Sequence, residues 1–436
     1  MKRNEIVCTA IGAFLSAVSF LAPTQACAAA GDLDTTFGRT GVVRTDFSGT
    51  DEYGFAVKVQ SDGKVLVGGQ SGVYPVFHAA LARYTANGRL DRTFGMGGKT
   101  TAALDPGGDG VQAIALQSDG KIVTAGSVIH DNFLLAFSVG RFNPDGTLDV
   151  TFGNNGSVQT TFGDSATEGN DVVLQTDGRI IVVGSTGAGS YSALNDFALA
   201  RYNPDGSLDQ SFGVGGKVTT HFPGVANTGS RALAGALQPN GKLVVVGTYV
   251  NQSTPNAFAL ARYNADGSLD TSFGNAGLVT TAIGGGNGFA FGVVVQRDGR
   301  IVLAGYSDGE DHDFALTCYT ADGMLDSTFG TAGVVTTNFS SNSDDIAYAL
   351  ALQRDGKLLV GGRVGQYPVF DFGVARYSST GQLDQSFGVG GKVTTDLGND
   401  ELGYGLTVQR DGKILLSGGI FNGSTFDFGV LRYLGQ

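Results

Sequence analysis

The stretch Gly31-Asp-Leu-Asp-Thr-Thr-Phe-Gly38 contains the pattern L-D-x-x-F-G, which the sequence repeats six more times. The later copies begin at Leu90, Leu148, Leu208, Leu269, Leu325 and Leu383. The first copy has no repeat body in front of it, and the chain ends at Gln436, where an eighth copy would be due. This offset predicts a closed ring in which the two ends of the chain meet.

Two further series run in phase with the first. The pattern Q-x-[D/N]-G-[K/R] occurs with Gln at 60, 117, 175, 238, 296, 353 and 409, at intervals of 57, 58, 63, 58, 57 and 56 residues. An arginine followed by an aromatic residue occurs at 83, 141, 201, 262, 376 and 432, and Cys318 takes the arginine position in the fifth repeat. Repeats of this period indicate a ring or array of similar units.

The fourth repeat shows the elements of one unit. Its expected strands are residues 232–238, 242–247, 258–263 and 268–273, with Asn240-Gly241 as the tight turn between the first two. An Asx-Gly pair between apolar runs supplies the positive φ that a two-residue hairpin needs. Each repeat is therefore expected to form one four-stranded antiparallel sheet.

The second strand contains runs that are apolar at every position, such as Ile180-Ile-Val-Val183 and Leu243-Val-Val-Val246. Both faces of such a strand must be buried. Seven two-faced antiparallel sheets predict an all-β fold, a seven-bladed β-propeller in which each blade packs between two neighbours. Residues 33–37, the first copy of the motif, are expected to supply the missing fourth strand of the last blade and so to close the ring, which removes two exposed sheet edges.

Composition and charge exclude several classes of protein. Gly makes up 70 of the 436 residues but Pro only 9, and 42% of the chain is apolar, which is typical of turn-rich globular β structure. The formal net charge is −12, and no basic run or stripe could follow a phosphate backbone. The sequence therefore argues against nucleic acid as a partner, whereas the acidic balance favours solubility and cationic partners.

Residues 1–30 have the features of a secretory signal, with Lys2-Arg3 before an apolar stretch and Ala28-Ala-Ala30 at its end. The expected mature chain, residues 31–436, is then one propeller domain without stable membrane insertion, and its net charge is −13, from 26 basic and 39 acidic residues. The alternative is a membrane anchor, for which the apolar run is short. We expect a monomer that is secreted, periplasmic or on the cell surface.

The mature chain retains one cysteine, Cys318, so no intramolecular disulfide can form. Because it occupies a strand position next to an aromatic residue, we expect its thiol to be buried and inert.

The pattern R-Y-N-x-D-G-x-L-D-x-[ST]-F-G, at 201–213 and 262–274, resembles the bacterial delta-60 repeat family over nearly the whole mature chain. The layout is also similar to NHL-type propellers. The resemblance implies the propeller fold and export, and it brings no catalytic residues. The repeated structural positions are Leu33, Asp34, Phe37, Asp91, Asp149, Asp209, Asp270, Asp326, Asp384, Arg201 and Arg262. The arginine is expected to pair with the aspartate of L-D-x-x-F-G, a pairing that Cys318 removes from one blade.

Binding residues are expected on the variable loops between the second and third strands and on those that enter each blade, because short D-G turns make the opposite face plain. Aromatic residues in Val73-Tyr-Pro-Val-Phe-His78 and Gln366-Tyr-Pro-Val-Phe-Asp371 could stack on a sugar or hold a peptide, or could pack over the blades. The candidate residues are Tyr74, Phe77, His78, His130, Asp131, Tyr191, Tyr249, Tyr367 and Phe370.

The loop 307–313 gathers carboxylates around an imidazole, and no cofactor is required by any other pattern. Oxygen ligands at this density suit Ca²⁺, and a solvated acidic loop is the alternative. The candidate ligands are Asp308, Glu310, Asp311 and Asp313.

The sequence therefore favours an exported binding or interaction module that presents its loops to a protein, peptide or glycan, and an enzyme is the less favoured class. One alternative is a metal-dependent hydrolase or lactonase with carboxylates from several blades at the central channel. Another is a structural cell-surface protein. A channel lined by carboxylates from three or more blades would favour the enzyme, and an apolar or plain polar channel would favour binding.

Overall fold

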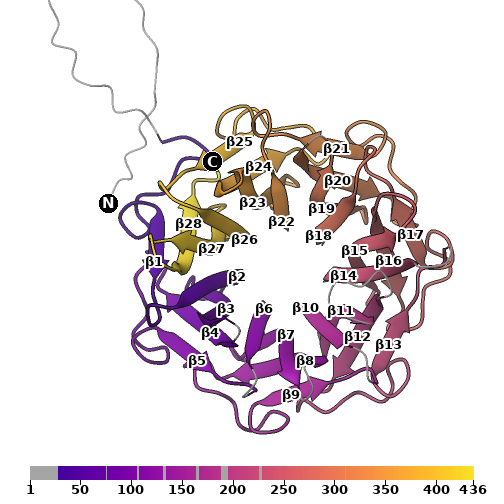
Figure 1. Ribbon diagram of the computed structural model, residues 1–436, viewed down its shortest axis with the longest axis horizontal. Helices are drawn as coiled ribbons and strands as arrows, with labels where there is room; N and C mark the ends of the chain where they lie inside the picture. Colours follow the sequence, from indigo (N-terminus) through magenta and orange to yellow (C-terminus); the bar gives the residue numbers. More distant parts are fainter. Residues whose placement is uncertain are drawn as a thin grey trace, which may run out of the picture.

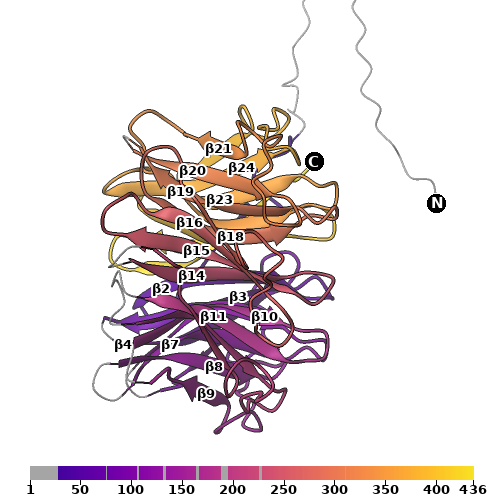
Figure 2. The same cartoon turned by 90° about the vertical axis from the view of Figure 1, so that its right-hand side faces the viewer.

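The computed structural model describes residues 28–436, apart from 75, 106–107, 131–133, 164–165, 188–194, 225–227 and 310. The described residues form seven four-stranded antiparallel sheets arranged in a ring around a central opening (Figure 1). Figure 2 shows the same ring from its side as a disc of stacked blades. The predicted seven-bladed β-propeller is confirmed. The expected signal segment lies almost wholly outside the described residues.

Within each blade the strands follow one another from the channel outwards. Blades 1 and 2 contain β2 (Asp51–Val59), β3 (Val65–Val73), β4 (Val76–Tyr84), β5 (Lys99–Ala102), then β6 (Asp109–Leu116), β7 (Ile122–His130), β8 (Leu134–Phe142) and β9 (Ser157–Thr160). Blades 3 and 4 contain β10 (Ala166–Leu174), β11 (Ile180–Gly187), β12 (Asp196–Tyr202), β13 (Lys217–Thr220), then β14 (Thr228–Leu237), β15 (Leu243–Asn251), β16 (Ala257–Tyr263) and β17 (Leu278–Thr281).

The remaining blades follow the same order. Blades 5 and 6 contain β18 (Gly288–Val295), β19 (Ile301–Asp308), β20 (His312–Tyr319), β21 (Val334–Thr337), then β22 (Ile346–Leu352), β23 (Leu358–Gln366), β24 (Val369–Tyr377) and β25 (Lys392–Thr395). Blade 7 contains β26 (Glu401–Val408), β27 (Ile414–Phe421) and β28 (Phe426–Tyr433), and its outermost strand is β1 (Val42–Thr45) from the other end of the chain.

The ring closes through an N-terminal strand, as predicted, but the strand is not residues 33–37. β1 pairs with β28, with Val42 opposite Leu431 and Thr45 opposite Phe428. Leu33 makes only an isolated bridge to Tyr433. The expectation of a fourth strand at residues 268–273 is wrong in the same way, because the fourth strand of that blade is β17, which begins at Leu278.

The motif L-D-x-x-F-G forms a turn because its aspartate binds the backbone that follows it. Oδ1 of Asp34 accepts hydrogen bonds from the Thr36 N–H at 3.0 Å and the Thr36 hydroxyl at 2.7 Å. Gly38 and Gly41 then adopt φ of 60° and 86°, values that reverse the chain. The strand comes after this turn, in runs such as Lys217-Val-Thr-Thr220, whose β-branched residues were the signal for it.

The motif also explains why six of the seven repeats carry basic residues at two fixed positions. Oδ2 of Asp209 lies 2.8 Å from Nε of Arg201 and 2.9 Å from Nε of Arg179, which follows the first D-G turn. The Arg201 guanidinium also lies 4.5 Å from the Phe212 ring centroid and donates to the carbonyl of Ala265 in the next blade. One arginine thus joins its own turn to the neighbouring blade.

The same arginine–aspartate contact occurs in six blades, and the fifth blade differs. The pairs are Arg83–Asp91, Arg141–Asp149, Arg201–Asp209, Arg262–Asp270, Arg376–Asp384 and Arg432–Asp34. In the fifth blade Cys318 is fully buried, and Asp326 instead has Arg300 at 3.5 Å.

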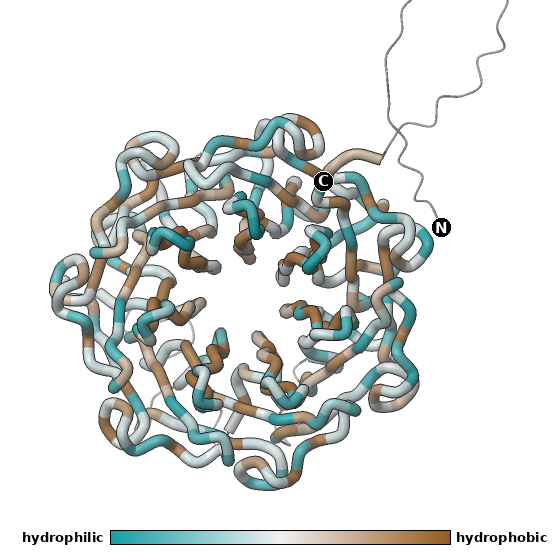
Figure 3. Tube along the Cα trace, turned by 180° about the vertical axis from the view of Figure 1, so that it is seen from behind, coloured by the Kyte–Doolittle hydropathy of each residue, from teal (hydrophilic) through white to brown (hydrophobic). Residues whose placement is uncertain are grey.

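The core consists of clusters between adjacent blades. Ile180 and Val182 of β11 pack in the cluster shared with blade 2, whereas Ile181 and Val183 pack in the cluster shared with blade 4. Both faces of the second strand are therefore buried, as its continuous apolar run predicted. Hydrophobic segments occur in every blade of the ring (Figure 3). No helix in the described part of the chain is long and apolar enough to cross a membrane.

Candidate functional site

The inner strand of every blade contains a β-bulge at the same place. Its pairing with the second strand shifts register there in all seven blades. A bulge leaves a residue unpaired and re-aims its side chain. The bulged residues are Phe55, Gln112, Asn170, Leu233, Phe291, Tyr348 and Tyr404, and all seven line the central channel, a cavity of about 390 Å³.

Four of these residues form an aromatic arc along one side of the channel. Tyr404 has its ring centroid 4.9 Å from that of Phe55 and 5.2 Å from that of Tyr348, and Tyr348 lies 5.1 Å from Phe291. These residues belong to blades 1, 7, 6 and 5, which are consecutive around the ring. All four rings are half-buried, so part of each is open to a ligand.

The arc continues towards the face that carries the loops between second and third strands. At one end, Tyr53 lies 6.0 Å from Phe55 and 6.4 Å from Phe77. At the other end, Tyr306 lies 6.0 Å from Phe291 and 4.9 Å from His312. We refer to the rings of Phe55, Phe291, Tyr348 and Tyr404, with Tyr53 and Tyr306 at the ends, as the aromatic arc.

Polar groups lie next to the arc and across from it. Burial raises the pKa of Tyr53 to about 12, and burial also raises the pKa of Tyr348, so both hydroxyls remain donors at neutral pH. The charge of Arg363 acts on Tyr348 and Tyr404, and its Nε has no hydrogen-bond partner among the described residues. On the opposite side, Gln112 is exposed and Asn170 donates to the carbonyl of Ala232 at 2.8 Å.

The described channel lining contains one carboxylate, Asp171. Its Oδ2 accepts a hydrogen bond from the Gly235 N–H at 2.9 Å. Burial raises the pKa of Asp171, while hydrogen bonding and the charge of Lys58 oppose this shift. The hydrolase or lactonase alternative required carboxylates from three or more blades at the channel, and the described lining provides one, from blade 3.

A larger cavity, of about 1160 Å³, lies at the opposite face, which was expected to be plain. It is lined by the turns between first and second strands of blades 1, 2 and 7, including Gln60, Gln117 and Gln409. The sequence showed these turns to be short and uniform but could not show that they surround a hollow.

In the two similar aromatic loops, 73–78 and 366–371, the tyrosines are exposed and the phenylalanines pack against other side chains. Tyr74 and Tyr367, at the tips of the β3–β4 and β23–β24 hairpins, are 83% and 79% exposed. Phe77 instead contacts the aromatic arc, and Phe370 is buried beneath the Arg363 guanidinium, 4.2 Å from its ring centroid. Tyr249 packs near Phe222 at 6.3 Å. Asp131, Tyr191 and the side chain of His130 lie outside the described residues.

The described histidines contact separate carboxylates. His78 lies 3.8 Å from Asp109, and His221 lies 2.8 Å from Asp196. His312 lies between Asp308 at 2.9 Å and Asp344 at 3.0 Å.

The described carboxylates of the predicted calcium loop lie in different surroundings. Asp308 accepts a hydrogen bond from Asn287 at 2.7 Å, besides its contact with His312. Asp313 lies on β20, where burial raises its pKa, and Asp311 is half-buried. Glu310 lies outside the described residues.

Six segments of the chain match a family model described as "Domain of unknown function (DUF5122) beta-propeller". They are residues 60–94, 117–152, 175–212, 238–273, 296–329 and 353–387, each running from the glutamine of the first D-G turn to the phenylalanine of L-D-x-x-F-G. The two parts of the seventh repeat lie at opposite ends of the chain. No curated protein matches the sequence significantly.

Solved structures with a similar fold include two polysaccharide lyases. Uly1 is 12% identical, with a TM-score of 0.51, covering 88% of this chain and 90% of its own. The PL25 ulvan lyase bound to -[GlcA(1-4)Rha3S]- is 11% identical, with a TM-score of 0.50, covering 90% of this chain and 96% of its own. Sqt1 of Chaetomium thermophilum, bound to the N-terminus of ribosomal protein L10, is 12% identical, with a TM-score of 0.45, covering 90% of this chain and 98% of its own.

At these identities the likeness to solved structures shows the fold alone. The chain is a repeat protein with the β-propeller fold, and six of its repeats are similar to the DUF5122 beta-propeller family.

Proposed function

We propose that the protein is an exported, non-enzymatic binding module that holds a glycan or peptide segment against the aromatic arc. The observation that carries this proposal is the continuity of half-buried rings across four consecutive blades, at centroid separations of 4.9, 5.2 and 5.1 Å. Aromatic side chains offer large apolar faces, and tyrosine adds a hydrogen-bonding group.

The composition of the channel also supports binding. A ligand site typically combines apolar and aromatic lining with a few polar groups that fix orientation. Here the polar groups are the hydroxyls of Tyr348 and Tyr404, the side chain of Gln112 across the channel, and Arg363 beside the arc. The arc reaches the loop face through Tyr53 and Phe77, so the loop tips Tyr74 and Tyr367 are proposed as further contacts for a larger partner.

The test compares Tyr348→Ala and Tyr404→Ala with the unchanged protein on glycan and peptide arrays, followed by calorimetry with the best ligand. We expect each change to weaken binding by about tenfold or more, as for truncation of a central aromatic residue in an interface. The matched control is Phe339→Ala, a half-buried aromatic residue whose ring centroid lies 5.0 Å from that of Phe314 and which is not part of the arc. Equal effects of all three changes, or unaltered binding in both arc variants, would contradict the proposal.

A further inference from the structure

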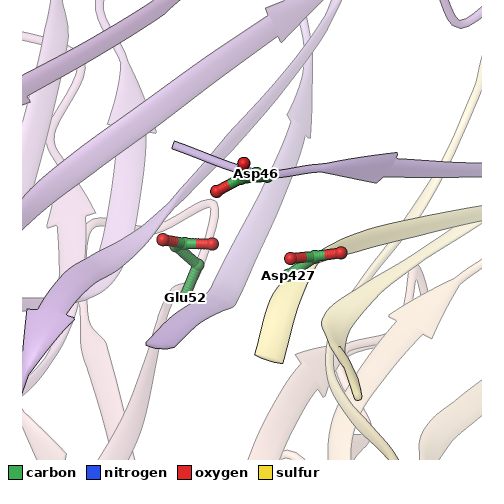
Figure 4. A group of neighbouring side chains, drawn as sticks. All are labelled: Asp46, Glu52 and Asp427. Atoms are coloured by element: carbon green, nitrogen blue, oxygen red, sulfur yellow. The ribbon is translucent and has the colours of Figure 1, made fainter. Parts of the chain in front are cut away.

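Three carboxylates meet where the ring closes. Asp46 directly follows β1, Glu52 lies on β2, and Asp427 lies on β28, so they come from the two ends of the chain. One oxygen from each lies within 4.8 Å of the others. Figure 4 shows the three carboxylates facing a common space between these strands. Three like charges at this separation repel one another unless something between them compensates.

Glu52 is the residue for which the structure provides the least compensation. Its side chain is fully buried, and Oε1 accepts hydrogen bonds from the Thr50 hydroxyl at 2.8 Å and, weakly, from the Ser71 hydroxyl at 3.4 Å. The Phe47 N–H forms a weak hydrogen bond that lowers the pKa of the carboxyl, but no hydrogen bond of normal geometry reaches Oε2 from any described residue. A buried, unpartnered carboxylate oxygen is costly, so this one requires a proton or a cation.

The neighbouring blade junction provides an internal comparison. Asp371, Asp396 and Glu401 occupy the equivalent positions and form a similar cluster. There, however, Oε2 of Glu401 accepts the Leu397 N–H at 3.2 Å and Oε1 accepts the Asn399 N–H at 3.3 Å. Both oxygens of Glu401 are thus occupied by the protein, whereas Glu52 has one oxygen directed at the other two carboxylates without a hydrogen-bonded donor.

Among the described residues, no cation forms an ion pair with any of the three carboxylates. Nζ of Lys99 donates to the backbone carbonyl of Asp46 at 2.6 Å rather than to its carboxylate. Arg44 influences Asp427 only through its charge. Asp46 and Asp427 each use one oxygen, Oδ1, to accept hydrogen bonds from the Gly49 N–H at 2.6 Å and the Asn422 amide at 2.9 Å. These bonds fix the two carboxylates and leave their Oδ2 atoms available as ligands.

We propose that Asp46, Glu52 and Asp427 bind a divalent cation, and that their ligand chemistry favours Ca²⁺. Hard oxygen ligands suit this ion, whose flexible coordination at about 2.3–2.6 Å accommodates carboxylates from three segments of the chain. Mg²⁺ demands near-octahedral geometry at about 2.0–2.1 Å and keeps several of its waters, so it is the less suited ion. The bound ion ties the closing strand β1 to both the first and the last blade, so it stabilises the closed ring. This inference is independent of the proposed ligand-binding function.

The test is calorimetric titration of chelator-treated protein with CaCl₂, together with its melting temperature with and without Ca²⁺. We expect uptake at this site and a rise in melting temperature, because a ligand that binds the folded state stabilises it. Glu52→Gln keeps the shape but removes a charged ligand, and Asp427→Asn provides a second variant should the first fold poorly. Each should weaken uptake by about tenfold or more and abolish the thermal shift.

Glu401→Gln is the matched control, because both oxygens of Glu401 already have donors, and it should retain the uptake and the thermal shift. Absence of Ca²⁺ uptake by the unchanged protein would overturn the proposal. So would loss of uptake in Glu401→Gln with retention in Glu52→Gln. If stability instead falls with rising pH by less in Glu52→Gln than in the unchanged protein, and Ca²⁺ does not alter this difference, the cluster holds a proton in place of an ion, and the proposal is wrong.

Discussion

Nε of Arg432, near the C-terminus, lies 2.8 Å from Oδ2 of Asp34, near the start of the described chain. Nζ of Lys413 contacts the same oxygen at 2.9 Å. Arg432 also lies over the ring of Phe37 and donates to the carbonyl of Ala86 in blade 1. Two ends of the chain and two blades are therefore joined through one aspartate.

Asp34→Asn should destabilise the protein by about 3 kcal/mol, because it removes one partner of a buried ion pair and leaves two cations uncompensated. The measurement is chemical denaturation. Asp326→Asn is the matched control, because Cys318 replaces the arginine there and Arg300 is 3.5 Å away, so its cost should be smaller. Equal costs in the two blades would contradict the role assigned to the arginine.

Phe142→Tyr should destabilise the protein by about 1–3 kcal/mol, and Ala102→Thr should restore most of the loss. In six junctions the hydroxyl of a tyrosine that ends the third strand bonds to a threonine on the fourth strand of the preceding blade, as in Tyr84–Thr45 at 2.7 Å. Between blades 1 and 2 both partners differ, since Phe142 meets Ala102 in one core cluster.

The double-mutant cycle measures this coupling directly. A favourable interaction of about 1–3 kcal/mol, similar to the penalty that the added threonine relieves, is expected only when both hydroxyl-bearing side chains are introduced together. Denaturation of the two single variants and the double variant measures it. Additive effects of Phe142→Tyr and Ala102→Thr would show that no bond forms at this junction.

Cys318→Arg should stabilise the protein by on the order of 1 kcal/mol, because charge-assisted hydrogen bonds to Asp326 would be restored. Blade 3 shows that two arginines fit beside one aspartate, since Arg179 and Arg201 both contact Asp209. Thermal unfolding measures the change. Cys318→Ala, which removes the thiol without adding a partner, is the control, and a lower melting temperature for the arginine variant than for the alanine variant would contradict the expectation.

Cys318 should react slowly with thiol reagents in the native protein. Its side chain is fully buried, and burial raises the pKa of its thiol to about 12, so little reactive thiolate forms at neutral pH. The measurement is the labelling rate under native conditions against the rate in denaturant. Comparable rates in the two conditions would show that the thiol is accessible.

Glu401→Gln should reduce the dependence of stability on pH between about 4.5 and 7. Burial, together with Asp371 and Asp396, raises the pKa of Glu401 from 4.5 to about 7 in the folded protein. The folded state therefore binds a proton that the unfolded state has released, so stability falls as pH rises through this window and levels off above it. Denaturation across pH 4–8 measures the slope, and identical slopes for the two proteins would refute the assignment.

Much of the architecture follows from the sequence alone. The in-phase motifs set the number of blades, the D-G turns set the first hairpin of each blade, and apolar runs such as Ile180-Ile-Val-Val183 require burial on both faces. The local sequence pattern predicted the fourth strand at the wrong place. Asp34 and its equivalents hold L-D-x-x-F-G in a turn through side-chain hydrogen bonds, and the β-branched run after the turn forms the strand that pairs with the third strand of the blade.

The candidate sites depended on contacts between distant parts of the chain. The bulged residues Phe55, Tyr348 and Tyr404 are far apart in sequence, and the packing of the blades places Tyr404 about 5 Å from both other rings. The contact with Phe55 forms because closure of the ring sets blade 1 beside blade 7. Asp46, Glu52 and Asp427 likewise meet only because β1 pairs with β28. Sequence periodicity therefore determined the repeated blade, since its turns and buried strands are local. The tertiary structure decided which side chains share the channel and the closing junction, since those positions depend on how seven blades pack around one axis.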